Sequence, residues 1–437
     1  MNLKKIISNT SWLIGEKIIV MVANLLVTVV LARALGAEQY GLLNYLLAIV
    51  ALIAPVTALG LNAIVTREIV NKPTDTNKII STSLCLRFGC SLIVLSLFIG
   101  LILFSNIIQA NEEKLGLILL CLGNIFTCFY VLDFWFQAHV KAKIVTKMKF
   151  IIVVSFSVIK VLIALFNPKL VYIVLAFSLE VALIGGGFLF IYIKAKKVDT
   201  FSFKDIDLTY GRKLLGQSYW LILSGIASIV YLKIDQLMLN HMIDSNAVGT
   251  YAVASRLSEV WYFFANALVI TLFPALLKIR DNSKYYLIKL QKICDILFVS
   301  ALLLAILVTI FGPIFIVLLF GEEYSVSGRI LQWHIWAAVF VFMRALASKW
   351  LIAESLLKYS LITHGVGAII NIIANYYLIP LYAGEGAAIA TIISYFAASF
   401  LAFWFSKSTR LIAVVMLKSI LLPFTFGKRY WKIGKNN

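Results

Sequence analysis

The sequence predicts an all-α integral membrane protein with twelve transmembrane helices in two six-helix lobes and with both termini cytoplasmic. Three observations predict it: an apolar composition, twelve apolar stretches of membrane-spanning length, and basic residues concentrated in alternate connections. The 437-residue chain is 62% hydrophobic and has a mean hydropathy of +0.97. Soluble globular chains are only about 45–50% apolar.

Each of the twelve stretches is long enough for a bilayer core, which takes about 20 residues of helix. To within a few residues they cover 12–33, 42–64, 79–104, 115–137, 148–167, 170–193, 215–240, 248–277, 293–320, 329–350, 359–380 and 385–405. The first apolar run continues to Leu35 and lacks an Ala-x-Ala cleavage site, so we interpret it as an uncleaved span rather than a signal peptide.

Basic residues alternate between the connections. The N-terminus, connections 2–3, 4–5, 6–7, 8–9 and 10–11 and the C-terminal tail hold 29 Lys and Arg, and the intervening connections hold only 4. The positive-inside rule predicts this split for twelve spans with both termini cytoplasmic. The net charge of +19 is therefore mainly a topology signal, whose expected partners are membrane lipids with anionic headgroups, with no nucleic acid.

The tail holds one further apolar run, Leu411–Phe426, which Lys418 and Pro423 interrupt. A thirteenth span would place the basic end of the chain outside the cell. We therefore expect a cytoplasmic helix that lies in the membrane interface.

The chain repeats itself at an offset of 208 residues. SWLIGEKIIVMVANLLVTVVLARALGAEQYG from Ser11 aligns with YWLILSGIASIVYLKIDQLMLNHMIDSNAVG from Tyr219, and Gly41 matches Gly249. Six spans per half make the halves parallel repeats, and transporters of this kind bind cargo between the repeats near the midplane. The predicted domains are a lobe over 1–205, a lobe over 206–408 and a basic tail over 409–437.

Soluble enzyme signatures are missing. The chain contains no Gly-rich phosphate loop, no zinc-spaced Cys/His pairs and no His-Glu-x-x-His motif. The five Cys fall within or at the edge of apolar stretches, in an odd number, so we interpret them as buried apolar side chains rather than disulfides. We expect no metal, no cofactor and no enzymatic activity.

Eleven charged side chains lie well inside the predicted spans, away from the span ends, and a charge at the centre of the bilayer costs about 2.5–3.5 kcal/mol. Six lie near the predicted midplane: Lys160, Glu180, Lys233, Asp235, Arg256 and Glu259. Five lie in the predicted cytoplasmic half: Glu16, Lys17, Arg87, Asp133 and Arg344. Because hydrophobic packing gives no reason for the six midplane charges, we expect those six to face a wet cavity of a transporter.

Ion pairing is the competing interpretation. Arg256 and Glu259 are three residues apart on one helix face and are placed to neutralise each other. Lys160 and Glu180 lie on adjacent spans joined by a short connection and are placed to pair across the lobe.

Two arginines have no acidic neighbour within their own span. Arginine suits phosphate because its planar fork binds two oxygens at once. Arg87 and Arg344, together with Arg256, therefore mark a hypothetical path for an anionic cargo. The alternative is that Arg87 and Arg344 reach back to the lipid headgroups.

Three segments resemble one family of membrane proteins. They are LARALGAEQYGLLNYLLAIVALIAPVTALGL in spans 1–2, KIDQLMLNHMIDSNAVGTYAVASRLSE in spans 7–8 and LKYSLITHGVGAIINIIANYYLIPLYAGEGAAIAT in spans 11–12. In their order they resemble the Wzx-type polysaccharide flippases, which handle O-antigen or capsule repeat units, of the multidrug/oligosaccharidyl-lipid/polysaccharide exporter superfamily. The likeness covers most of the chain, although its motifs are patterned apolar stretches rather than a catalytic signature.

The resemblance implies a multi-pass protein of the bacterial cytoplasmic (inner) membrane that works by alternating access. Its implied cargo is an undecaprenyl-pyrophosphate-linked oligosaccharide repeat unit, flipped from the cytoplasmic to the outer leaflet for lipopolysaccharide O-antigen or capsule synthesis. A polysaccharide polymerase and glycosyltransferases join the expected partners. The candidate substrate-binding residues are Lys17, Arg87, Lys160, Lys233, Arg256 and Arg344. The candidates for ion coupling or charge pairing are Glu16, Asp133, Glu180, Asp235 and Glu259.

An ion-coupled exporter of small molecules or drugs from the same superfamily stays open as the alternative function. A cationic drug favours an acidic and aromatic lining, whereas the eleven charges that lie well inside the spans are six basic and five acidic. A polymerase or ligase is disfavoured, because its catalytic residues would need a large outer loop, and the predicted outer connections are short.

Overall fold

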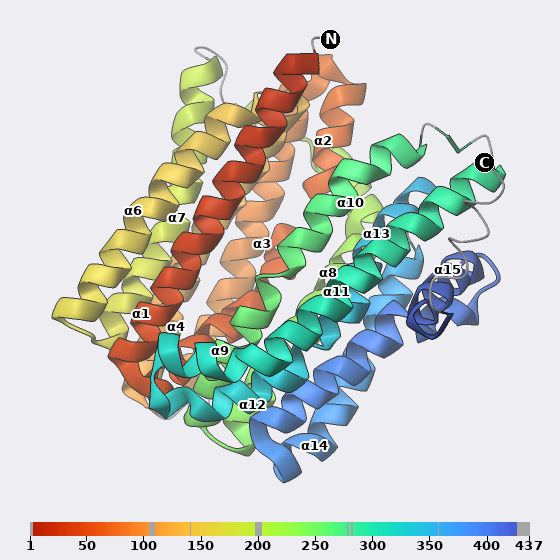
Figure 1. Ribbon diagram of the computed structural model, residues 1–437. Coiled ribbons are helices and arrows are strands. Elements are labelled where there is room, and N and C mark those ends of the chain that lie inside the picture. Colours follow the sequence, from red (N-terminus) through yellow and green to blue (C-terminus); the bar gives the residue numbers. More distant parts are fainter. Residues whose placement is uncertain are drawn as a thin grey trace. The chain divides into compact units, whose positions relative to one another are not determined.

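The computed structural model describes residues 3–104, 110–139, 141–196, 203–277, 279–280, 283–356 and 358–425, with the side chains of 3–17, 63, 142, 196, 203, 274, 283 and 425 left out. Every regular element in these ranges is a helix (Figure 1). Packing divides the chain into two compact units, Met1–Asn240 with Asp244–Gly249, and His241–Ile243 with Thr250–Asn437.

The first unit is built from the N-terminal helices and most of α8. Its elements are α1 (Leu3–Ala58), α2 (Asn62–Asn71), η1 (Pro73–Asp75), α3 (Thr76–Phe104), α4 (Asn111–Ile125), η2 (Phe126–Tyr130), α5 (Val131–Ala138), α6 (Ala142–Phe166), α7 (Leu170–Lys196), η3 (Phe203–Asp205) and α8 (Leu208–Met242).

The second unit is built from the C-terminal helices and most of α9. Its elements are α9 (Ser245–Glu259), α10 (Tyr262–Leu277), α11 (Ser283–Phe320), η4 (Glu322–Tyr324), α12 (Ser325–His334), α13 (Ala337–Ala353), α14 (Lys358–Ser399), η5 (Leu401–Phe405), α15 (Arg410–Ile420) and η6 (Pro423–Thr425).

The helices have the length and composition of membrane spans. Within the described ranges nine helical segments are long and apolar enough to cross a membrane, and the bent pair Glu322–His334 and Ala337–Ala353 makes a tenth. With so many apolar helices, the protein is an integral multi-pass membrane protein.

Two of the long helices, α1 and α14, contain a residue with non-helical backbone angles that divides each into two segments. The 56 residues of α1 correspond to about 84 Å of helix, against a hydrocarbon core of about 30 Å. Gly36 breaks α1 with φ 72° and ψ 169°, and Ala383 breaks α14 with φ 47° and ψ −125°. In Figure 1 the red ribbon of α1 runs away from the end marked N, and α2 lies back near that end. Both breaks fall in predicted connections, 1–2 and 11–12, and the count of twelve crossings stays a prediction.

The short helix α2 lies between the membrane-spanning segments and is amphipathic. Leu61, Ile64, Val65 and Ile69 recur at helical spacing and join a buried cluster with residues of α3, α5 and α7. The opposite face leaves Arg67 exposed. This packing fixes α2 at the edge of the first unit.

The backbones of α1 and α9 cross in direct contact. A Cβ atom on Gly41 would overlap the backbone oxygen of Ser245, and a Cβ atom on Gly249 would overlap the backbone oxygen of Ala37. Only glycine permits this approach at both positions.

The tail helix α15 packs on the second unit. Ile412, Ala413, Val415 and Met416 are buried in a cluster with residues of α10, α11 and α13. The apolar run of the tail therefore forms a helix over Arg410–Ile420, whereas its predicted cytoplasmic location stays a prediction. Residues 426–437 lie outside the described ranges.

Candidate functional site

Arg87 in α3 is a buried cation without a carboxylate partner. Its side chain is 3% exposed, and its Nη2 donates to the Thr127 backbone oxygen of η2 at 3.2 Å. Its Nε and Nη1 have no hydrogen-bond partner, and within the described part of the chain no carboxylate oxygen forms an ion pair with it. Unpaired buried N–H groups are costly, so this side chain is not explained by packing stability.

Lys160 and Glu180 form an ion pair between α6 and α7, the pair that the sequence suggested. Lys160 Nζ also lies 3.7 Å from the centroid of the Phe177 ring, in cation–π geometry. Both charges are therefore compensated within the first unit.

Asp133 in α5 is compensated as well. Its Oδ2 accepts hydrogen bonds from Lys149 Nζ and from Gln137 Nε2, both at 3.1 Å. Lys149 is thus the counter-ion of a predicted site residue.

A groove of about 630 Å³ opens beside these residues, between α2 and α5. It is lined by Asn62, Thr66, Arg67, Val70, Asn71, Phe134 and Gln137. Amides, a hydroxyl, a guanidinium and an aromatic ring are groups that hydrogen-bond to sugar hydroxyls, pair with phosphate and pack on sugar rings.

None of the predicted site residues lines this groove. The sequence did contain a pattern that could have indicated this groove. Asn62, Thr66 and Asn71 recur around Arg67, so that polar groups gather on one side of a short helix between two apolar stretches. Arg67 Nη2 donates to Gln217 Oε1 of α8 at 2.5 Å and lies 3.3 Å from Glu68 Oε1.

Polar contacts fasten the start of α8 to α2 and α3. Tyr210 Oη donates to Glu68 Oε2 at 2.9 Å, and Lys78 Nζ lies 2.5 Å from Asp207 Oδ2. Burial by itself raises the pKa of the Glu68 carboxyl, but hydrogen bonds from Tyr210 and from Lys72 outweigh burial and lower that pKa below its ordinary value. The Lys78 ammonium likewise lowers the pKa of Asp207. These contacts explain why α8 packs with the first unit.

Arg344 in α13 has several partners in the second unit. Its Nη1 donates to the Ala398 backbone oxygen at 2.9 Å and its Nη2 to Thr363 Oγ1 at 2.7 Å. The guanidinium carbon lies 5.3 Å from the centroid of the Phe403 ring. The buried side chain therefore ties α13 to α14 and η5.

The other predicted charges are dispersed. Arg256 is exposed and Glu259 half-buried, and among the described residues no ion pair joins the two. Lys233 is half-buried and Asp235 is buried. The side chains of Glu16 and Lys17 lie outside the described residues. The transport roles of all these residues stay predictions.

Solved structures with the same fold are flippases and transporters. Lipid II flippase MurJ in an inward closed conformation is 18% identical with a TM-score of 0.73, over 94% of this chain and 91% of that one. An inward-facing MATE family multidrug resistance transporter of the MOP superfamily is 13% identical with a TM-score of 0.71, over 91% of this chain and 96% of that one. A MOP superfamily transporter from Pyrococcus furiosus, described as having a binding pocket of reverse polarity, is 14% identical with a TM-score of 0.58, over 92% and 93%.

At these identities the likeness establishes the fold alone. No curated protein sequence matches the chain. The family model for polysaccharide biosynthesis proteins matches residues 6–280, which is more than half of the chain. This match confirms the family resemblance carried by the first two sequence segments; the third segment, in predicted spans 11–12, lies beyond the matched residues. The chain belongs to the polysaccharide biosynthesis protein family and has the fold of the MOP superfamily flippases and transporters.

Proposed function

We propose that this protein flips undecaprenyl-pyrophosphate-linked oligosaccharide repeat units from the cytoplasmic to the outer leaflet of the bacterial inner membrane. The repeat units serve surface polysaccharide synthesis, as O-antigen or capsule, and the polymerase and glycosyltransferases of that pathway are its partners. Family membership and the fold shared with a lipid II flippase support this function.

The observation that carries the proposal is the unpaired cation Arg87. The acids Asp133 and Glu180 of the same unit are each paired with a lysine, whereas among the described residues no carboxylate pairs with Arg87. A pyrophosphate supplies the missing negative charge when the helices around Arg87 part during transport. A cationic drug increases the electrostatic cost instead, which disfavours the multidrug exporter, the alternative function with the same fold.

The groove beside Arg67 is the proposed first contact for the cargo head group. It lies at α2, in a connection that the positive-inside rule assigns to the cytoplasmic side. Its amides and aromatic ring suit the sugars, and Arg67 suits the pyrophosphate.

The proposed frame is twelve spans in two parallel lobes, 1–205 and 206–408, with both termini cytoplasmic. The contact of α1 with α9 supports the repeat. Gly41 approaches Ser245 while Gly249 approaches Ala37, and these residues are partners at the same offset of 208 positions. A two-fold axis through a contact produces this reciprocity. The two lobes would move relative to each other in alternating access.

Deletion of the gene in its native host tests the proposal. We expect lipid-linked repeat units to accumulate on the cytoplasmic face and surface polysaccharide to be lost, and a plasmid copy to restore it. Arg67→Ala should complement poorly, whereas the matched control Lys114→Ala, on a predicted outer connection, should complement fully. Normal surface polymer together with new sensitivity to cationic drugs would refute the flippase and favour the drug exporter.

A further inference from the structure

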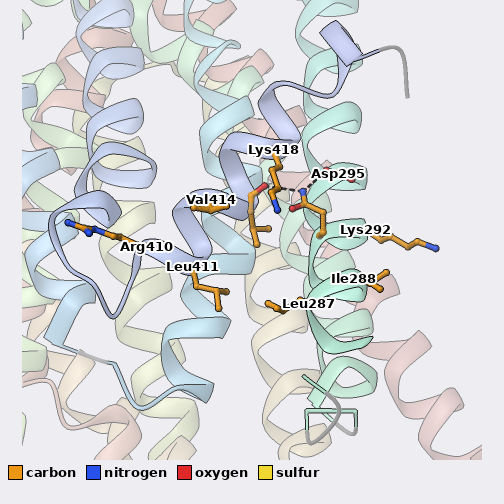
Figure 2. A pocket seen from close by; sticks show the side chains of 10 residues that line it. Leu287, Ile288, Lys292, Asp295, Arg410, Leu411, Val414 and Lys418 are labelled. Carbon is orange, nitrogen blue, oxygen red and sulfur yellow. Dashed lines mark hydrogen bonds between the residues drawn. The ribbon is translucent and has the colours of Figure 1, made fainter. Parts of the chain in front are cut away.

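A second groove, of about 580 Å³, lies in the second unit between α11 and α15. Its floor is apolar: Leu287 and Ile288 come from α11, and Leu411 and Val414 from α15 (Figure 2). Leu287 and Leu411 remain 38% and 40% exposed. The groove therefore presents open apolar surface between two packed helices.

Buried polar contacts hold the two helices together and preform the groove. Ser419 Oγ of α15 donates to Asp295 Oδ1 of α11 at 2.6 Å. Gln291 Nε2 donates to the same carboxylate oxygen at 2.8 Å and lies 3.0 Å from the Val415 backbone oxygen. Asp295 itself is buried, and one of its carboxylate oxygens accepts both of these hydrogen bonds.

Three cations flank the groove: Lys292, Arg410 and Lys418. In Figure 2 Lys418 stands beside Asp295, while Arg410 and Lys292 extend to opposite sides. With Asp295 as the one acid of the lining, the lining residues carry a net charge of +2. The groove thus combines an apolar floor with a basic rim.

The distribution of lysines on α11 favours a position for the groove at a membrane–water interface. The 38 residues of α11 correspond to about 57 Å of helix, which exceeds a hydrocarbon core of about 30 Å. Its first turns carry Lys284, Lys289 and Lys292, and lysines concentrate where a span leaves the bilayer. The groove is at this basic end, where we expect lipid headgroups.

We propose that this groove binds one anionic phospholipid. Its acyl chains cover the apolar floor, and its phosphate is bound by Lys418 with Arg410 and Lys292 at the sides. Basic pockets between helices at an anionic leaflet bind such headgroups, and apolar surface that faces a bilayer is covered by lipid. The bound lipid bridges α11 and the tail helix α15. This inference does not depend on the identity of the cargo.

The test measures binding of phosphatidylglycerol to the purified full-length protein in nanodiscs by native mass spectrometry. Lys292→Gln/Arg410→Gln/Lys418→Gln is compared with Lys143→Gln/Lys147→Gln/Lys284→Gln, which loses the same charge outside the groove. We expect the groove variant to bind at least about tenfold more weakly, since each cation near the surface contributes several-fold. The control variant should bind like the wild type. Val414→Trp, which fills the groove without changing its charge, should also displace the lipid.

Three results would overturn the proposal. One is equal phosphatidylglycerol binding by the groove and control variants. The second is equal binding of phosphatidylcholine, which indicates a nonspecific apolar surface. The third is one-for-one displacement of phosphatidylglycerol by undecaprenyl phosphate, which would make the groove a cargo site. None of these results depends on whether deletion abolishes surface polysaccharide, so failure of this inference and failure of the flippase proposal are distinguishable.

Discussion

The Lys160–Glu180 ion pair offers a test that separates structural pairing from a role in transport. The two side chains are 4% and 14% exposed. Lys160→Met removes the cation and leaves the Glu180 carboxylate in apolar surroundings. Lys160→Met with Glu180→Leu removes both charges and replaces them with apolar groups of similar size.

The expected magnitudes follow from burial. Loss of one partner of a buried pair costs about 3–5 kcal/mol of unfolding free energy. The single variant also loses the contact of Lys160 with the Phe177 ring at 3.7 Å, which is worth about 1–2 kcal/mol within that total. The double variant should return to within about 1–2 kcal/mol of the wild type, because a buried pair is close to neutral against apolar replacements.

The assay is denaturant unfolding of the purified protein in mixed micelles, run beside surface polysaccharide complementation in the deletion host. Lys147→Met, an exposed position on the same helix α6, serves as the control. If the pair is structural, the double variant recovers both stability and export. If Glu180 or Lys160 takes part in transport, stability recovers and export does not. A single variant as stable as the wild type would refute the reasoning from burial.

The remaining predictions concern one residue each. Arg87→Leu should raise the unfolding free energy by about 1–2 kcal/mol, because it removes unpaired buried N–H groups, while surface polysaccharide falls; unchanged export in this variant would contradict the cargo role. Arg344→Leu should lower the unfolding free energy by about 2–4 kcal/mol through its lost hydrogen bonds, and a stability equal to the wild type would contradict the structural role. The pKa of Glu68 is lower in the folded protein than in the unfolded chain, where it is about 4.3. The Glu68 carboxylate therefore stabilises the fold fully above the unfolded-state pKa, and this stabilisation is lost as the pH falls through the folded-state pKa. The melting temperature should therefore drop on acidification in this range, and Glu68→Gln should reduce the drop; an unchanged pH profile in Glu68→Gln would count against the Tyr210 contact.

The membrane-spanning helices and the breaks between them were predictable from the sequence because they depend on the composition of each segment. Apolar composition and length decide that a segment forms a helix in lipid, where every backbone group must be hydrogen-bonded within the segment. The break at Gly36 accordingly falls in a predicted connection. The Lys160–Glu180 ion pair could be predicted from the sequence because its two spans follow each other directly in the chain.

Several features required the tertiary structure, because their partners are distant in the chain. Arg344 finds its acceptors at Thr363 and Ala398, and spacing within one span does not indicate these residues. Arg256 and Glu259 are close in the sequence, yet among the described residues no ion pair joins them. Positions three apart on a helix allow two side chains to pair but do not force them to do so.

The sequence by itself determined the class of the protein: the apolar spans, the alternation of basic connections and the family of its segments. Only the tertiary structure decided which charges are compensated, that Arg87 has no carboxylate partner among the described residues, and where grooves open beside Arg67 and between α11 and α15. The physical reason is one of range. The transfer of a segment into lipid is a sum over its own residues, whereas the environment of a charge is set by every helix that packs around it.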